Sequence, residues 1–114
     1  VDELSVREME RHPRLGLRAV GPRIVCRLFN ISLGGCGLLL RDEWPVGTWF
    51  ELELELSGGG LTLRLEVVFS APINEDNERW WRHGARISGL STADQTRVAQ
   101  EVRRREVNTS LTDA

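Results

Sequence analysis

Two neighbouring segments of the chain alternate strictly between apolar and polar residues. Residues 50–56 place phenylalanine or leucine at every second position with glutamate between them, and residues 61–67 repeat the alternation with leucine and valine. Such alternation is typical of antiparallel strands that bury one face. The glycine-rich segment 57–60 is predicted to join them as a hairpin, in which the glutamates either pair with Arg64 and Thr62 across the strands or face solvent.

Four other stretches have the length and composition of strands, and turn-rich segments separate them. They are residues 15–20, 23–29, 36–40 and 79–87. The first two are predicted to pair as a hairpin through the turn Gly21-Pro22. No helical crossover is indicated between any two strands, so we expect the strands to run antiparallel.

Helical signals are confined to the two ends of the chain. Residues 1–11 mix charged with apolar side chains and predict either a short amphipathic helix or a mobile segment, which Pro13 ends. Near the other end, Ser91 offers a hydroxyl N-cap and Asp94 follows three residues later. This pattern predicts a helix over residues 92–107.

A chain of 114 residues has the size of one domain. The predicted organisation is an N-terminal lead-in at residues 1–10, a domain at residues 11–107 and a flexible tail at residues 108–114. Six short strands followed by one helix predict an all-β fold, a small six-stranded antiparallel β-barrel (split barrel) with a C-terminal α-helix. Closure of the sheet removes the exposed edges that apolar strands would otherwise present.

The charge of the chain is small but unevenly distributed. The formal net charge is −2, and all 15 basic residues are arginine. This balance argues against a DNA- or RNA-binding protein, which needs a net or clustered positive field. Residues 11–27 nevertheless carry five arginines and no acid, whereas residues 42–55 carry five acids and no base. A local anionic ligand near the first arginines is therefore compatible with the sequence.

The two cysteines, Cys26 and Cys36, lie in predicted strands among apolar neighbours. Free buried thiols are favoured over a disulfide in a chain with no sign of secretion. Neither the cysteines nor His12 and His83 have the spacing of a zinc site, so no metal is expected. No apolar stretch approaches the length of a membrane span or the core of a signal peptide, which predicts a cytoplasmic protein.

The segment Asn30–Gly35, with the sequence Asn-Ile-Ser-Leu-Gly-Gly, is a polar turn between two apolar strands. Asn30 and Ser32 are two residues apart, so in an extended turn both side chains point to the same side. Gly34 and Gly35 permit positive φ angles and bring bare backbone to the surface. These features predict a small polar face that holds a ligand; the alternative is an Asx or Ser turn that satisfies only local backbone.

The order of these features resembles the PilZ domain family. An arginine-rich lead-in and a hairpin precede the motif Asn30-x-Ser32-x-x-Gly35, and Gly-Ala-Arg-Ile at residues 84–87 leads to the C-terminal helix. The resemblance covers residues 10–107. It implies a receptor domain for the bacterial messenger cyclic di-GMP, bound by an Arg-x-x-x-Arg motif before the first strand and by an [Asp/Asn]-x-Ser-x-x-Gly motif. No cofactor besides this ligand is implied.

The arginine motif departs from the family pattern. Glu10 stands where the first arginine of the motif falls, and Arg14 stands in the place of the second. An acid at this place repels phosphate. The resemblance therefore implies Arg11 and Arg14 as the arginines that bind the ligand, with Arg7 as a substitute.

The motif also implies Asn30, Ser32, Gly34 and Gly35 as ligand contacts. Aromatic residues extend the set. One of Trp80 and Trp81 is expected to face the site, since alternation points only one of the pair inward, and we assign Trp81. Trp44 and Trp49 are expected in the core or at its rim. His83 is either a phosphate contact or an ordinary strand residue.

The leading hypothesis is a non-catalytic cyclic di-GMP receptor. Its arginine lead-in folds over the ligand and changes contacts with a neighbouring domain or a partner protein. The resemblance associates such a receptor with the regulation of motility or exopolysaccharide. The alternative, which Glu10 favours, is a degenerate PilZ-like interaction module that does not bind the nucleotide. Catalysis is not expected, because no motif places an acid with Ser32, Cys36 and His83.

Overall fold

The computed structural model describes residues 2–56 and 58–113, with side chains described for residues 4–56 and 58–105. Three residues of the predicted segments lie outside this description: Val1 of the lead-in, Ser57 of the hairpin loop and Ala114 of the tail. The secondary-structure elements are β1 (Asp2–His12), β2 (Gly16–Ala19), β3 (Ile24–Ile31), β4 (Gly35–Leu40), β5 (Trp49–Leu56), β6 (Gly59–Glu75), β7 (Glu78–Ser88) and α1 (Thr92–Asp113). The strands form one antiparallel sheet in the order β2-β1-β3-β4-β7-β6-β5.

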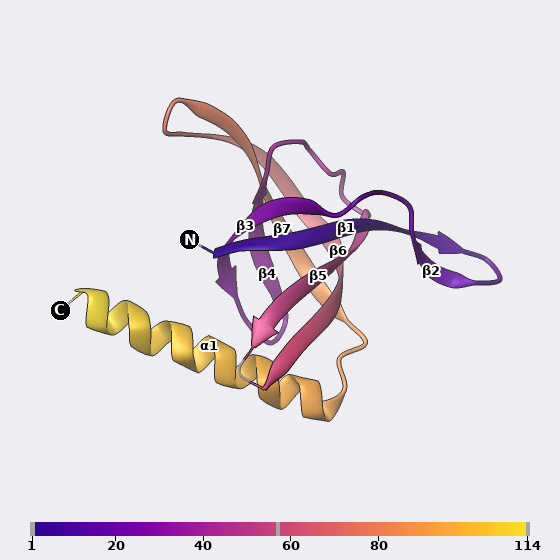
Figure 1. Ribbon diagram of the computed structural model, residues 1–114. Helices are drawn as coiled ribbons and strands as arrows, with labels where there is room; N and C mark the ends of the chain where they lie inside the picture. The colour runs from indigo at the N-terminus through magenta and orange to yellow at the C-terminus, as the bar shows by residue number, and fades with distance from the viewer. Residues whose placement is uncertain (1, 57, 114) are drawn as a thin grey trace.

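β1 closes this sheet into a ring, because it pairs along one edge with β3 and along the other with β5 (Figure 1). Asp2 to Val6 lie opposite β3, and Ser5 to Met9 lie opposite β5. Six strands of the described chain, β1, β3, β4, β7, β6 and β5, thus form an unbroken antiparallel ring. The predicted all-β fold, with a closed antiparallel sheet and a C-terminal helix, is confirmed.

The two segments before β3 differ from the prediction. The expected helix or mobile segment at the N-terminus is wrong, because residues 2–12 form β1. The expected hairpin of residues 15–20 with 23–29 is also wrong, because β2 pairs with the end of β1. The reason is tertiary: β3 and β5 both need a partner along one edge, and β1 supplies it to both.

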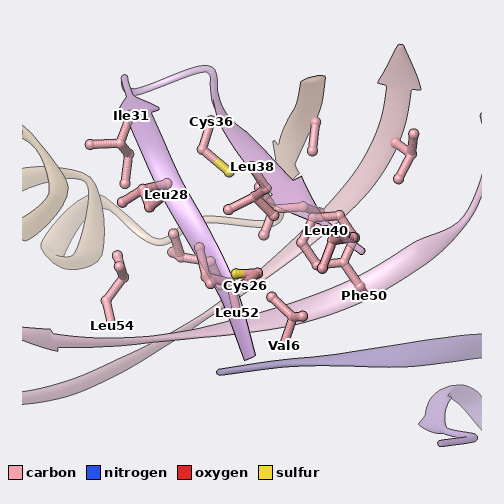
Figure 2. Packing of buried hydrophobic residues seen from close by; sticks show 14 of the residues in the cluster. Val6, Cys26, Leu28, Ile31, Cys36, Leu38, Leu40, Phe50, Leu52 and Leu54 are labelled. Carbon is pink, nitrogen blue, oxygen red and sulfur yellow. The ribbon is translucent and has the colours of Figure 1, made fainter. Parts of the chain in front are cut away.

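Inward-facing side chains of the ring strands form one hydrophobic core (Figure 2). Alternation along β5 and β6 buries Leu52 and Leu63 almost completely, as their sequence pattern predicts. Burial of each such leucine stabilises the fold by roughly 2 kcal/mol. Val6 and Met9 of β1 are buried too, at a spacing of three residues that hides the strand alternation.

Cys26 and Cys36 are free thiols within this core, as predicted. Burial raises the pKa of each thiol to about 12. Both thiols therefore stay protonated at neutral pH, and the thiolate form that reacts with electrophiles is absent.

His83 is fully buried beside the loop that follows β4. Its Nε2 atom accepts a hydrogen bond from the backbone N–H of Trp44 at 2.9 Å, and the ring of Trp44 packs on Phe50 at 5.2 Å between centroids. Burial lowers the pKa of His83 below its ordinary value of 6.5, so the imidazole is neutral. His83 is thus a structural strand residue, and its burial excludes a contact with phosphate.

The acidic stripe on β5 is an exterior face of the ring. Glu51 lies opposite Arg64 and Glu53 lies opposite Thr62 in the predicted register. The ion pair of this stripe is made with a residue outside the hairpin: the guanidinium of Arg23 lies 2.7 Å from the carboxylate of Glu53. Exposed pairs of this kind contribute at most about 1 kcal/mol, so the stripe is mainly a solvated surface.

β6 and β7 continue beyond the ring as a two-stranded arm (Figure 1). The arm ends in the turn Asp76-Asn77, where both residues have positive φ angles of 54° and 62°. A two-residue type I′ hairpin requires this combination, and Asp and Asn tolerate it. Of the turn-rich segment predicted at residues 72–78, only these two residues lie between the strands.

α1 begins at the predicted residue and ends later than predicted. The Ser91 hydroxyl accepts a hydrogen bond from the backbone N–H of Asp94 at 3.2 Å, which confirms the N-cap. The helix continues to Asp113, so the tail predicted after residue 107 is helical up to that residue.

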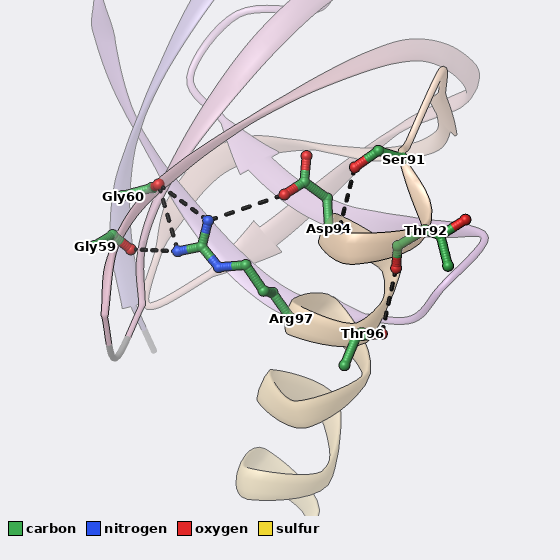
Figure 3. Close-up of polar contacts among 7 residues, drawn as sticks. All are labelled: Gly59, Gly60, Ser91, Thr92, Asp94, Thr96 and Arg97. Atoms are coloured by element: carbon green, nitrogen blue, oxygen red, sulfur yellow. Dashed lines mark hydrogen bonds and ion pairs between the residues drawn. The ribbon is translucent and has the colours of Figure 1, made fainter.

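Arg97 fastens α1 to the β5–β6 hairpin (Figure 3). Its guanidinium donates to the carbonyl of Gly59 at 2.7 Å and lies 3.9 Å from the carboxylate of Asp94. Val98 is fully buried against the core on the next position of the helix. One turn later, a hydrogen bond from Arg104 holds the pKa of the buried Glu101 below its ordinary value.

Candidate functional site

The turn between β3 and β4 is held by its own hydrogen bonds. The backbone N–H of Ser32 donates to the carbonyl of Gly35 at 2.8 Å, and the Ser32 hydroxyl accepts from the N–H of Gly34 at 3.3 Å. The carbonyl of Gly34 accepts from the N–H of Ile87 at 3.0 Å, which ties the turn to β7. The local Ser turn is therefore present, and the exposed hydroxyl of Ser32 keeps a lone pair for a ligand.

Asn30 and Ser32 both face the outside of the ring, in agreement with their spacing. Both residues are exposed, whereas Ile31 between them is buried. A β-bulge after Leu28 adds Phe29 to the same face, so two consecutive residues, Phe29 and Asn30, are exposed. Bulges re-aim side chains in this way and are frequent next to binding sites.

The two glycines of the turn have different surroundings. Neither Gly34 nor Gly35 uses the positive φ angle that glycine permits. A Cβ at Gly35 would collide with the carbonyl oxygen of Ala85 and lie 3.1 Å from its carbonyl carbon. A Cβ at Gly34 would meet nothing closer than the Ser32 hydroxyl at 4.0 Å. Gly35 thus lets β4 approach β7, and Gly34 leaves the surface of the turn open.

A row of glycines and aromatic rings crosses the outer face beside Asn30. Gly37 on β4 lies opposite Asn30 on β3 and opposite Gly84 on β7. The ring of Phe29 fills the space over Gly37, where a Cβ would collide with it. Phe69 on β6 lies over Gly84, 3.5 Å from the position of a Cβ there. These rings stay partly exposed, with exposed fractions of 37% for Phe29 and 51% for Phe69.

Arginines stack on aromatic rings along the same face. The Cζ atom of Arg82 lies 4.7 Å from the centroid of the Phe29 ring. The ring of Trp80 carries two arginines, with Arg41 at 3.8 Å and Arg27 at 5.3 Å from its centroid. Within the described part of the chain, neither Arg27 nor Arg82 forms an ion pair.

Arg41 on this face pairs with Glu78 at 2.8 Å, whereas Arg27 and Arg82 carry positive charge that no carboxylate of the described residues neutralises. The sequence alone did not single out Phe29, Arg82, Arg27 or Trp80 as members of one face. Their neighbourhood depends on the register of three strands, β3, β4 and β7, and on the bulge in β3. The arginine-rich sequence of β7 is the one local feature that could have indicated this face.

Trp80, rather than Trp81, shares the face of Asn30. Successive side chains of β7 point to opposite sides of the sheet. Trp80 therefore lies on the side of Arg82, whereas Trp81 lies on the side of the buried His83. The predicted ligand residue Trp81 is thus separated from Asn30 by the sheet itself.

The predicted arginines Arg11 and Arg14 lie far from the turn. β1 runs antiparallel to β3 with Asp2 opposite Leu28, so the turn after β3 lies near the start of β1. Arg11 is nine residues beyond Asp2, roughly 30 Å along an extended strand. There its Cζ atom lies 4.9 Å from the centroid of the Trp49 ring. Arg14 is exposed between β1 and β2.

Arg7 and Glu10 also lie on β1 away from the turn. Arg7 lies opposite Glu51 of β5, and its Nε atom is buried without a hydrogen-bond partner among the described residues. Glu10 is exposed and lies opposite Arg18 of β2. The structure thus brings together one half of the predicted site, namely Asn30, Ser32, Gly34 and Gly35. It does not bring Arg7, Arg11 or Arg14 to them.

In residues 2–56 and 58–113, no group of three or more His, Cys, Asp or Glu is placed to hold a metal ion. The Ser32 hydroxyl bonds to turn backbone, and Cys36 and His83 are buried. Within the described residues, no helix is both long and apolar enough to cross a membrane.

A comparison with known families gives a match over most of the chain. Residues 4–104 match the PilZ domain. The chain belongs to the PilZ domain family. The matched range includes β1, which completes the ring, and the turn motif at residues 30–35. No curated protein sequence matches this PilZ domain.

Several solved structures share the fold of this PilZ domain. The PilZ domain of YcgR from Escherichia coli, solved with c-di-GMP, is 17% identical with a TM-score of 0.63, and the match covers 97% of this chain and 89% of that one. K. pneumonia MrkH in complex with c-di-GMP is 16% identical with a TM-score of 0.62, and the match covers 96% of this chain and 50% of MrkH. The Bacillus subtilis inhibitor of motility MotI is 20% identical with a TM-score of 0.61, over 94% of this chain and 48% of MotI. The chain thus spans about half the length of MrkH and MotI.

Proposed function

We propose that this PilZ domain is a non-catalytic receptor that binds cyclic di-GMP on the outer face of β3, β4 and β7. The observation that carries the proposal is the turn at residues 30–35, which has the family motif and exposes the side chains of Asn30 and Ser32 on one face. Two proteins of the same fold, YcgR and MrkH, have been solved with this nucleotide.

The chemistry of the face suits such a ligand. A cyclic dinucleotide presents two phosphates, guanine N–H donors and broad stacking surfaces. The Asn30 side chain accepts from guanine donors, the Ser32 hydroxyl bridges a base or a phosphate, and arginine supplies charge, bidentate donation and a stacking plane. Four or five contacts of about 1 to 3 kcal/mol each support micromolar binding, about 8 kcal/mol net, after the costs of association.

Arg11 and Arg14 complete the site in this proposal, with Arg7 as a substitute. Arg11 lies roughly 30 Å along β1 from its start, so these arginines reach the ligand only when the β1–β2 hairpin, together with the part of β1 that pairs with β5 and holds Arg7, moves toward the turn. The hairpin is suited to such a motion, because β2 pairs only with β1 among the described strands and projects away from the ring (Figure 1). Its movement changes the contacts of the N-terminal segment with a neighbouring domain or a partner protein, and so transmits the signal.

Calorimetric titration with cyclic di-GMP tests the receptor function. We expect micromolar affinity for the folded domain, a loss of about tenfold or more for Ser32→Ala and Asn30→Leu, and retained binding for Asn30→Asp, whose carboxylate still accepts from guanine. Leu33→Ala, an exposed residue of the same turn, is the matched control and should bind like the wild type. Absence of binding by the folded wild-type domain overturns the proposal.

The role of the hairpin needs its own variants. Arg14→Ala should weaken binding about tenfold, whereas Arg18→Ala, on the other strand of the same hairpin, should leave it unchanged. Hydrogen exchange of residues 13–20 should slow when the ligand is added. Unchanged affinity of Arg14→Ala together with unchanged exchange would remove the hairpin from the site.

Glu10 favours a second function, a PilZ-like interaction module that does not bind the nucleotide. Its carboxylate repels phosphate at the place of the first motif arginine, and it lies exposed opposite Arg18. Under the receptor function, Glu10→Arg restores the motif and should raise the affinity for cyclic di-GMP. A stable complex with a partner protein that neither the nucleotide nor Glu10→Arg affects would favour the second function.

A further inference from the structure

Two β-bulges and two glycines lie in one row across the outer face of the ring. β3 bulges at Phe29, and β6 bulges immediately before Phe69. The two strands between them carry Gly37 and Gly84 directly opposite each other. Four adjacent strands therefore show the order bulge, glycine, glycine, bulge at one level of the sheet.

The row exposes flat apolar surface that the fold does not need. The bulge turns both Phe29 and Asn30 outward. The residues on either side of this pair, Leu28 and Ile31, are buried. Gly37 leaves room for the Phe29 ring, because any Cβ there would collide with it. Exposed aromatic side chains on a sheet form stacking platforms for nucleotide bases.

Arg82 lies on this platform. Its Cζ atom is 4.7 Å from the centroid of the Phe29 ring, within the range of a cation–π contact. Arg82 is exposed and forms no ion pair within the described residues, so one side of its guanidinium contacts the ring and the rest faces solvent. A planar cation held on an aromatic ring, on the same face as the amide of Asn30, offers a base both a stacking surface and a polar edge.

We propose that Arg82, held in place by Phe29, is the stacking residue for one guanine of the bound cyclic dinucleotide. This inference rests on the proposed function and assigns a residue to it that the family motifs do not contain. The base stacks on the guanidinium, and Asn30 accepts from the N–H groups of its Watson–Crick edge. The positive charge of Arg82 also attracts the phosphates of the ligand. Phe29 is a positioning residue, since it acts through Arg82.

Conservative variants separate stacking from charge and from folding. Arg82→Lys keeps the charge and loses the plane, and Phe29→Leu keeps an apolar side chain and loses the ring. We expect each to weaken cyclic di-GMP binding about tenfold in calorimetry. Arg79→Lys is the matched control, because Arg79 lies on the same strand with its Cζ atom 5.8 Å from the ring of Trp81, on the opposite side of the sheet from Arg82. It should bind like the wild type, and thermal melting should show that all three variants fold.

The double variant tests whether Phe29 acts through Arg82. Adding Phe29→Leu to Arg82→Lys should cost much less than about tenfold further, because the stack is already lost. If the wild type binds and Arg82→Lys binds as tightly as Arg79→Lys does, the stacking role is overturned while the receptor function stands. If the folded wild type does not bind at all, the receptor function fails and this assignment fails with it.

Discussion

Single residues decide how closely the strands of this PilZ domain approach each other. Gly35 begins β4 where a side chain would collide with the backbone of β7 at Ala85, whereas its neighbour Gly34 faces open space. Both glycines belong to the same turn and look equivalent in the sequence. Only Gly35 is required by the packing of the ring.

Gly35→Ala is expected to lower the free energy of unfolding by about 2 to 3 kcal/mol. The new Cβ has to displace backbone of β7, and overpacking of this kind is not relieved by a side-chain rotation. Gly34→Ala should stay within about 0.5 kcal/mol of the wild type. Urea unfolding of both variants gives the comparison, and equal loss of stability in the two would contradict the packing argument.

His83 couples the stability of the core to pH. Its neutral imidazole accepts the hydrogen bond from the Trp44 N–H, and burial lowers the pKa of His83 in the folded state below 6.5. Above pH 6.5 both states hold a neutral imidazole, so the group adds no pH dependence there. Below that value the imidazole is protonated in the unfolded chain but stays neutral in the folded domain. The free energy of unfolding therefore falls with falling pH.

The free energy of unfolding should therefore drop as the pH falls below about 6.5, with a slope of at most about 1.4 kcal/mol per pH unit. His83→Gln, which cannot titrate, should flatten this slope, although it is less stable at neutral pH. Leu33→Ala, an exposed residue that does not titrate, is the control and should keep the slope. A wild-type stability that does not change over this range would show that His83 protonates equally well in both states.

At the scale of elements, β1 is the strand that turns an open sheet into a ring. It lies between β3 and β5, and its side chains Val6 and Met9 enter the core. Without it, both neighbours have an unpaired edge and the core is open to water on one side. β1 is thus part of the domain and not a segment that precedes it.

Removal of residues 1–10, the segment predicted as a lead-in, should abolish the cooperative unfolding transition of the domain. In the full chain, Val6→Asp should have a comparable effect, because it places an unpaired carboxylate in the core. Glu8→Ala, two residues further on the same strand and exposed, should melt like the wild type. A truncated chain with the wild-type melting temperature, followed by circular dichroism, would show that β1 is dispensable.

At the scale of the whole molecule, one closed ring encloses a single core, and three parts project from it. The β1–β2 hairpin, the β6–β7 arm and α1 all extend beyond the ring (Figure 1). Access to the interior therefore requires opening of the ring. Cys26 and Cys36, inside the core on adjacent strands, report on such opening.

Both thiols should resist an aromatic disulfide reagent in the native domain and react together in denaturant. Burial raises the pKa of Cys26 and of Cys36 to about 12, so the reactive thiolate is scarce in the folded state, and both side chains are buried. The rate of labelling should follow the free energy of global unfolding. Fast labelling of one thiol at neutral pH without denaturant would reveal local opening of its strand.

Much of this domain follows from local sequence. The alternation in β5 and β6 marks their buried faces, Ser91 with Asp94 marks the start of α1, and the apolar neighbours of the cysteines mark them as buried. The turn at residues 30–35 is recognisable for the same reason, because strand, turn and glycine signals all lie within a few residues. Each of these features depends on side chains that are close along the chain.

The partners of the strands were decided only by the tertiary structure. β1 has mixed charge and buried residues three positions apart, so its sequence pattern does not predict a strand. β2 has the sequence pattern of a ring strand, yet it pairs outside the ring. The bulge at Phe29 breaks the alternation on which face assignments rely, and register alone brings Arg82 to it. Alternation within a strand is a local property, whereas pairing and register depend on contacts between residues far apart in sequence.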